Sequence, residues 1–143
     1  MHDIYIAGGL TRCKDPGRMK RFYEKIADAC REAGFSPYLP HQHTDPREHP
    51  EHAPQDVYAK NHEIVSKARM IIAYVGEPSL GVGSELEIAK NNRTRIILHF
   101  FSTDKVSRMA RGNPAVLKTI TYDSEDEAIS KIREFLKFLP EKK

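Results

Sequence analysis

The 143-residue sequence lacks several features that mark whole classes of protein. Two cysteines are too few for a disulfide framework and fit a reducing cytosol. No apolar run approaches the ~18 residues that a membrane span needs, and no signal-peptide pattern precedes the first strand-like run. Charge of one sign is also scarce, because 23 Lys and Arg face 20 Asp and Glu, and the basic residues are interspersed with acidic ones. We therefore expect a cytoplasmic protein that binds neither nucleic acid nor membrane.

Length and composition predict one domain over residues 1–143. Typical domains have ~100–200 residues, and the sequence contains no internal repeat or linker. The apolar fraction of 39% and the charged fraction of 30% are typical of a globular chain. A small enzyme and a binding module both remain open.

Short apolar runs alternate with helical patterns along the chain. The run at residues 4–7 predicts a strand, and apolar residues spaced by three and four from Met19 to Ala33 predict a helix that Gly34 ends. The other expected strands are 35–39, 70–75, 95–101 and 117–122, and the other expected helices are 56–67, 84–91, 105–111 and one after the capping box at 124–127. Residues 40–55, with four prolines and four histidines, should form no regular element.

This alternation predicts an α/β fold, namely a flavodoxin-like (Rossmann-like), doubly wound, five-stranded parallel sheet with helices on both faces. Ligands of such folds bind at the carboxyl ends of the strands, near the switch point of the strand order. That rule selects four segments as candidates for a site: 8–12, 40–54, 76–85 and 102–111.

The segment at residues 77–86 is the most informative of the four. Its glycines, Gly81 and Gly83, allow close approach of a ligand or a positive φ, and the loop leads into a helix N-terminus that favours an anion. Glu85 should lie in the first turn of that helix and stay ionised, as suits a nucleophile or an electrostatic stabiliser. A structural βα turn with a helix-stabilising Glu is the alternative. The dinucleotide and P-loop fingerprints are both incomplete.

Three segments carry a resemblance to a known family. The run Pro-Ser-Leu-Gly-Val-Gly-Ser-Glu-Leu at 78–86 resembles the active-site loop of 2′-deoxynucleoside 5′-phosphate N-hydrolases, which belong to the nucleoside 2-deoxyribosyltransferase-like superfamily. Residues 5–8 resemble the first strand and turn of that family, and residues 106–112 resemble its late Ser-x-Met-x-Arg-Gly segment. The resemblance covers nearly the whole chain.

The resemblance implies an N-glycosidase that acts on (2′-deoxy)nucleoside 5′-monophosphates without a cofactor. Glu85 matches the catalytic glutamate, which forms a glycosyl-enzyme intermediate that water hydrolyses to the sugar phosphate. Tyr5 matches a tyrosine near the sugar, and Gly8 matches the turn that follows the first strand.

The resemblance also implies how the 5′-phosphate is held. Ser79 matches a phosphate-binding serine, and Gly81 and Gly83 match glycines of the same loop. Ser107 matches a serine that reaches the phosphate from the neighbouring subunit, which implies a homodimer. Arg12 is the counterpart of a phosphate-binding arginine, and hydroxyl groups and guanidinium forks suit such a ligand.

One residue departs from the family pattern. Asn61 stands where the superfamily has an aspartate that helps protonate the departing base or holds the sugar, and an amide supplies no proton at neutral pH. Asp56, His62 and Glu77 are the nearest replacements in sequence. Alternatively, a base of low pKa departs with little protonation, or the protein is a non-catalytic nucleotide-binding module.

The histidine-rich segment raises the question of a metal site. The spacing of His41, His43, His49, His52 and His62 matches no structural zinc site, and no cysteine supports one, so we expect no metal. A long irregular segment of this kind is typical of a lid over the base pocket. Either His43 or Asp45 could contact the edge of the base, and solvated loop histidines are the alternative.

A second enzymatic interpretation stays open beside hydrolysis. A nucleoside 2-deoxyribosyltransferase would pass the sugar to another base and would not recognise a phosphate. Because Ser79 and Ser107 match phosphate-binding serines, the sequence favours the hydrolase.

Overall fold

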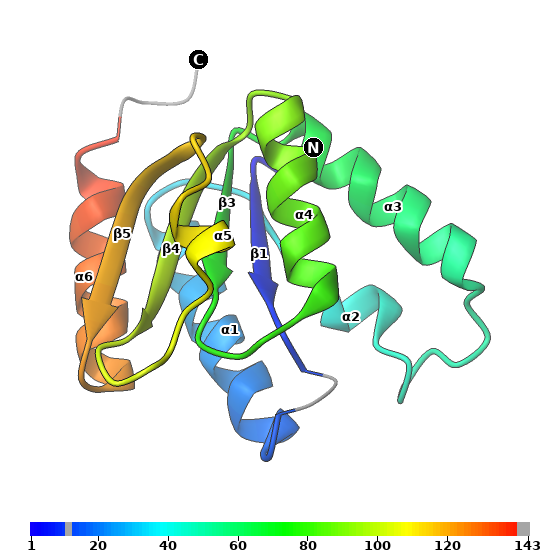
Figure 1. Cartoon of the computed structure of the whole chain (residues 1–143), viewed down its shortest axis with the longest axis horizontal. Coiled ribbons are helices and arrows are strands. Elements are labelled where there is room, and N and C mark those ends of the chain that lie inside the picture. Colours follow the sequence, from blue (N-terminus) through cyan, green and yellow to red (C-terminus); the bar gives the residue numbers. More distant parts are fainter. Residues whose placement is uncertain (11–12, 140–143) are drawn as a thin grey trace.

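The computed structural model describes residues 1–10 and 13–139 of the chain (Figure 1). The elements follow in the order β1 (Ile4–Gly8), α1 (Pro16–Glu32), β2 (Pro37–Tyr38), α2 (His41–Thr44), α3 (Pro54–Lys67), β3 (Met70–Tyr74), α4 (Leu80–Asn91), β4 (Arg95–Phe101), α5 (Arg108–Arg111), β5 (Val116–Tyr122) and α6 (Glu125–Lys137). No helix within these described ranges has the length and apolar character needed to cross a membrane.

The strands form one parallel sheet in the order β2-β1-β3-β4-β5. Tyr5 of β1 lies between Tyr38 of β2 and Ile71 of β3 in the register of the sheet. This order confirms the predicted flavodoxin-like fold and places the switch point at β1 and β3, whose carboxyl ends therefore mark the expected ligand site.

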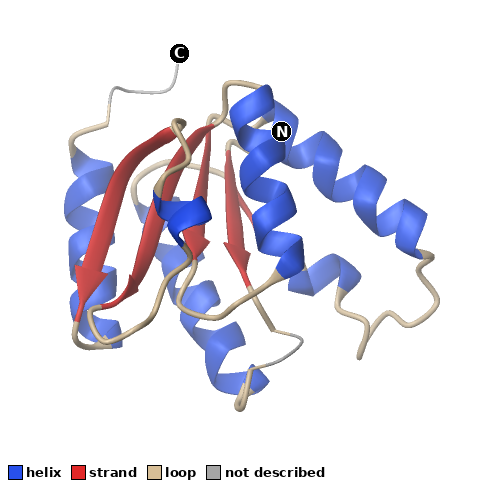
Figure 2. Cartoon of the chain, viewed as in Figure 1, coloured by secondary structure: helices blue, strands red, loops and turns tan. Residues whose placement is uncertain are grey.

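Helices cover both faces of the sheet, as Figure 2 shows. In β1, Ile4 and Ile6 pack into the cluster that contains residues of α1 and α6, whereas Tyr5 and Ala7 pack into the cluster that contains residues of α3 and α4. Because successive strand residues point to opposite faces, a side chain such as Tyr5 is aimed at α4, and this direction matters for the site.

Helix α4 begins earlier than the sequence pattern predicts. Ser79 is its N-cap residue, and the Ser79 Oγ accepts a hydrogen bond of 3.2 Å from the backbone amide of Val82. The two loop glycines therefore lie in the first helical turn, and Glu85 lies in the second turn rather than the first. Their low helix propensity concealed this turn in the sequence.

Residues 40–55 also contain more regular structure than expected. The short helix α2 forms there because the backbone amides of His43 and Thr44 donate to the Pro40 carbonyl at 3.0 and 2.9 Å. Helix α3 begins at Pro54, not at Asp56, since proline fits the first turn of a helix, where its missing N–H costs nothing.

Candidate active site

A carboxylate and a phenol meet at the carboxyl end of β1. Tyr5 is fully buried, and its hydroxyl donates a hydrogen bond to Oε2 of Glu85 on α4. The Tyr38 ring stacks on the Tyr5 ring with centroids 5.7 Å apart, which fixes the orientation of Tyr5. The pair Tyr5–Glu85 is therefore held from both the sheet and the helix layer.

Burial dominates the electrostatics of this pair. Desolvation raises the pKa of Glu85 to about 7, although the hydrogen bond from Tyr5 opposes the rise. The expectation of a carboxylate kept ionised by the first helical turn is therefore wrong, because Glu85 lies one turn further on, where its surroundings raise its pKa instead. Burial also raises the pKa of Tyr5 well above its ordinary value, so its hydroxyl remains a donor at neutral pH.

The largest space beside Glu85 is the α3–α4 cavity, of about 390 Å³. One wall is a face of α3 and the opposite wall is a face of α4, and on each helix the lining residues recur every three or four positions, as residues on one helical face do. The lining residues are Pro54, Val57, Tyr58, Asn61 and His62 of α3, Gly81, Ser84, Glu85 and Ile88 of α4, and Thr44, Pro46, His49, Pro50 and His52 of the intervening segment. This size falls in the range of small-molecule sites.

A smaller space, the β1 cavity of about 170 Å³, lies at the carboxyl end of β1. Ser79, Gly81 and Glu85 line it from the start of α4, and Gly8 lines it from the strand. Glu85 and Gly81 line both this cavity and the α3–α4 cavity. Glu85 thus lies where the larger α3–α4 cavity meets the smaller β1 cavity.

The two glycines nearest to Glu85 serve different purposes. A Cβ on Gly8 would lie 2.2 Å from Cζ of Tyr23, whose hydroxyl donates to the Gly9 carbonyl at 3.0 Å, so packing alone demands a glycine there. A Cβ on Gly81 would meet nothing closer than Ser79 Oγ at 3.8 Å. Neither has a positive φ, so Gly81 leaves room in the cavities rather than supplying a special backbone conformation.

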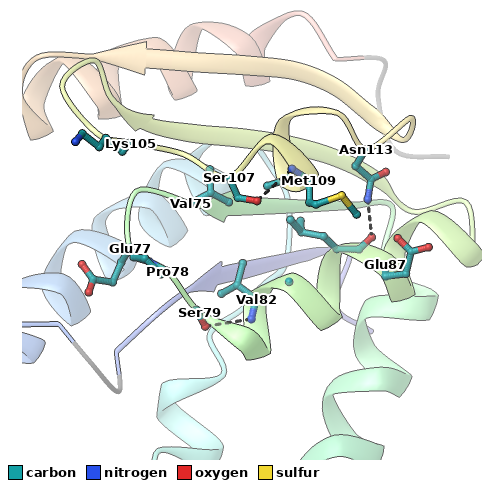
Figure 3. Close-up of a pocket in the computed structure, with 13 residues that line it drawn as sticks. Val75, Glu77, Pro78, Ser79, Val82, Glu87, Lys105, Ser107, Met109 and Asn113 are labelled. Atoms are coloured by element: carbon teal, nitrogen blue, oxygen red, sulfur yellow. Dashed lines mark hydrogen bonds between the residues drawn. The ribbon is translucent and has the colours of Figure 1, made fainter.

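A third space, the α4–α5 cavity of about 410 Å³, lies across α4 from the α3–α4 cavity (Figure 3). Ser79, Gly83 and Ser107 line it together. Ser107 is the N-cap residue of α5, and its Oγ accepts a hydrogen bond of 3.1 Å from the Met109 amide. Ser107 and Gly83 line neither of the two cavities at Glu85; among the described residues, Ser79 and Val82 are the ones that line both the α4–α5 cavity and the β1 cavity.

The remaining predicted residues are distributed unevenly. Asn61 lines the α3–α4 cavity, and its Oδ1 is buried without a hydrogen-bond partner among the described residues. His43 is exposed and stacks on Tyr38 with centroids 4.7 Å apart, outside both cavities at Glu85. Asp45 lines the β1 cavity and pairs with Lys20. Arg12 lies outside the described residues.

The three residues that the sequence offered as proton donors differ in their position relative to the cavities at Glu85. Asp56 is exposed and lines neither cavity at Glu85. Glu77 lines the α4–α5 cavity, with its carboxylate pointing away from Ser107 in Figure 3. His62 alone of the three shares a cavity with Glu85.

One group of possible metal ligands occurs among the described residues, at His49, Glu51 and His52. Oε1 of Glu51 lies 3.4 Å from His49 Nδ1 and 3.6 Å from His52 Nε2. The two rings stack with centroids 5.3 Å apart and planes inclined by 7°. Because the nitrogen lone pairs lie in these nearly parallel planes, they do not converge on one ion, and the arrangement is that of a carboxylate shared by two imidazoles.

Sequence reasoning missed Arg47. This residue lines the β1 cavity with Ser79, and its Nη2 donates to the Leu10 carbonyl at 3.3 Å. It is a cation at the smaller end of the site, where a phosphate ligand was expected from Arg12. No spacing or motif marks it in a segment expected to be irregular, so only the folded geometry reveals it.

Comparison with known proteins bears out the resemblance seen in the sequence, through a curated relative that matches part of the chain and solved structures of nucleoside 2-deoxyribosyltransferase-like proteins that share its fold. A protein of Syntrophotalea carbinolica with the provisional name 2′-deoxynucleoside 5′-phosphate N-hydrolase 1 is 33% identical over 73 residues. The match covers 50% of this chain and 51% of that protein, so it spans about half the length of the relative. No family model matches the chain.

Solved structures share the fold over nearly the whole chain. The CMP N-glycosidase BcmB of Clostridium botulinum has a TM-score of 0.72 at 18% identity, covering 92% of this chain and 98% of that chain. BlsM has a TM-score of 0.75 at 17% identity, with 95% and 90% covered. A 2-deoxyribosyltransferase of Bacillus psychrosaccharolyticus has a TM-score of 0.63 at 13% identity, with 90% and 94% covered.

Proposed function

We propose that the protein hydrolyses the N-glycosidic bond of (2′-deoxy)nucleoside 5′-monophosphates, releasing the free base and the sugar 5-phosphate. The observation that carries this proposal is Glu85, which lies where the α3–α4 and β1 cavities meet and accepts a hydrogen bond from Tyr5. A nucleotide has a matching division, with a flat base on one side of the anomeric carbon and a phosphate on the other.

In this arrangement the base occupies the α3–α4 cavity and the phosphate occupies the β1 cavity. The Ser79 hydroxyl, the amides at the start of α4 and the Arg47 guanidinium provide the donors that a phosphate needs. The Glu85 carboxylate attacks the anomeric carbon, and the Tyr5 hydroxyl stabilises the carboxylate between turnovers. Water then cleaves the glycosyl-enzyme ester.

We also propose that the active form is a homodimer in which Ser107 contacts the phosphate bound by the neighbouring copy. Within its own chain Ser107 is separated from Glu85 by α4, so a second copy is needed to bring it to that phosphate. Met109, which is 87% exposed and lines the α4–α5 cavity, supplies apolar surface on this side for such a contact.

The test is chromatography of base release from the common ribo- and deoxyribonucleoside monophosphates. Glu85→Gln should abolish release, whereas Glu63→Gln, which changes an exposed carboxylate on α3 outside every cavity at Glu85, should not. A Glu85→Gln variant with the wild-type rate would refute the proposed nucleophile.

A deoxyribosyltransferase is the second candidate, because a solved enzyme of that activity shares the fold. The same assay separates the two when a second free base and the unphosphorylated nucleosides are included. Preference for nucleosides together with transfer to the added base would replace the hydrolase proposal.

A further inference from the structure

The proposed reaction needs a proton donor in the α3–α4 cavity, and Asn61 cannot be that donor. A base that departs with the electron pair of its glycosidic bond leaves far more readily if it is protonated as it goes. Asn61 occupies the position of the expected acid, but an amide donates no proton at neutral pH. Any donor must therefore be another residue that lines this cavity.

The described titratable residues that line the cavity are few. Glu85 is the nucleophile, and the imidazoles of His49 and His52 stack on each other and share the Glu51 carboxylate. Tyr58 is 60% exposed and its ring packs beside the His62 ring, with centroids 5.8 Å apart. His62 is thus the imidazole in the cavity without a carboxylate partner among the described residues.

The helix places His62 close to the missing acid. His62 follows Asn61 directly on α3, and both residues line the α3–α4 cavity. One residue along a helix advances by about 1.5 Å and turns by about 100°, and the lining of the cavity shows that both side chains still reach it. Imidazole is also the side chain that most readily gives and regains a proton near neutral pH.

We propose that His62 is the general acid of the reaction, an inference that rests on the proposed N-glycosidase function. As Glu85 attacks the anomeric carbon, the bond to the base breaks, its electron pair passes to the base, and the His62 imidazolium gives the base a proton. A water molecule then adds its hydroxyl to the anomeric carbon and returns its proton to His62, which frees the Glu85 carboxylate. Each cycle thus consumes one water and restores both residues.

Leaving groups of different acidity test this role. We expect His62→Gln to slow base release from the best nucleoside monophosphate by ~10²–10⁴-fold. It should slow hydrolysis of 4-nitrophenyl 2-deoxyribose 5-phosphate by less than about tenfold, because nitrophenolate leaves without a proton. The aryl substrate also reports that the variant is folded. Asp56→Asn, an exposed carboxylate on the same helix, should leave both rates unchanged.

Two outcomes would overturn the proposal: equal losses on both substrates, or no loss on the nucleotide. Restoring the acid one position earlier gives an independent check, since Asn61→Asp combined with His62→Gln should regain at least tenfold on the nucleotide, and no regain would also count against His62. A wild-type protein that cleaves neither substrate would instead refute the proposed function itself.

Discussion

Replacing the Glu85 carboxylate by an uncharged amide should stabilise the folded protein at high pH. The amide oxygen of Glu85→Gln can still accept the hydrogen bond from the Tyr5 hydroxyl, so the substitution mimics the protonated acid. Since burial raises the pKa of Glu85 to about 7, the folded protein holds this proton at a higher pH than the unfolded chain does. Stability is therefore lost as the pH rises from about 4.5 to about 7, and the loss is complete above that range.

The size of the effect follows from the same pKa. At about 1.4 kcal/mol per pKa unit, a rise from 4.5 to about 7 corresponds to about 3 kcal/mol. Glu85 is partly exposed, and solvent screening reduces the figure to about 2 kcal/mol. For a chain of this size that free energy is worth about 4–8 °C in Tm.

Thermal unfolding at a series of pH values provides the assay. We expect Glu85→Gln to unfold about 4–8 °C above the wild type at pH 8, and the two proteins to coincide at pH 4. Glu63→Gln on α3, an exposed control, should follow the wild type at both values. A difference in Tm that is constant across pH, or a less stable Glu85→Gln at pH 8, would refute the prediction that ionisation of Glu85 destabilises the folded protein.

Three further predictions concern single positions. Gly8→Ala should destabilise the protein by about 1–3 kcal/mol in urea unfolding, because its Cβ would meet Tyr23 at 2.2 Å, and unchanged stability would contradict that contact. Gly81→Ala should raise the free energy of unfolding by up to about 1 kcal/mol and raise KM, since the methyl enters the cavities at Glu85; an unchanged KM would place the ligand elsewhere. Met109→Glu should convert a dimer into a monomer in light scattering, and a wild type that is already monomeric would end the dimer proposal.

The sheet could be predicted because its signals are local. A short apolar run such as 70–75 indicates a strand within a few residues. The start of the last helix is equally local, because the Ser124 Oγ accepts a hydrogen bond of 3.1 Å from the Glu127 amide. The boundaries that failed depend on context. The glycines of the 77–86 segment have low helix propensity. The helix α4 nevertheless begins before these glycines, because Ser79 caps it and because Val82 and Leu86 pack on the sheet.

The candidate site divides in the same way. Residues within the glycine-rich segment are linked by sequence proximity, so Ser79, Gly81 and Glu85 could be selected together. Their relation to Arg47 and His62 depends on how α3 and residues 40–55 fold back over the end of β1, which no local pattern states. The sequence also gave no sign that the pKa of Glu85 is raised, because that depends on burial by distant elements.

Helix α4 is the common wall of the α3–α4 and α4–α5 cavities. It behaves as a short rod, so any displacement moves Ser79 and the Glu85 carboxylate together. If a second copy docks on the side of Met109, the way it packs against α4 also sets the position of the Glu85 carboxylate. Turnover per subunit should then fall on dilution, over the concentration range in which the two copies separate, while the fold of each copy persists.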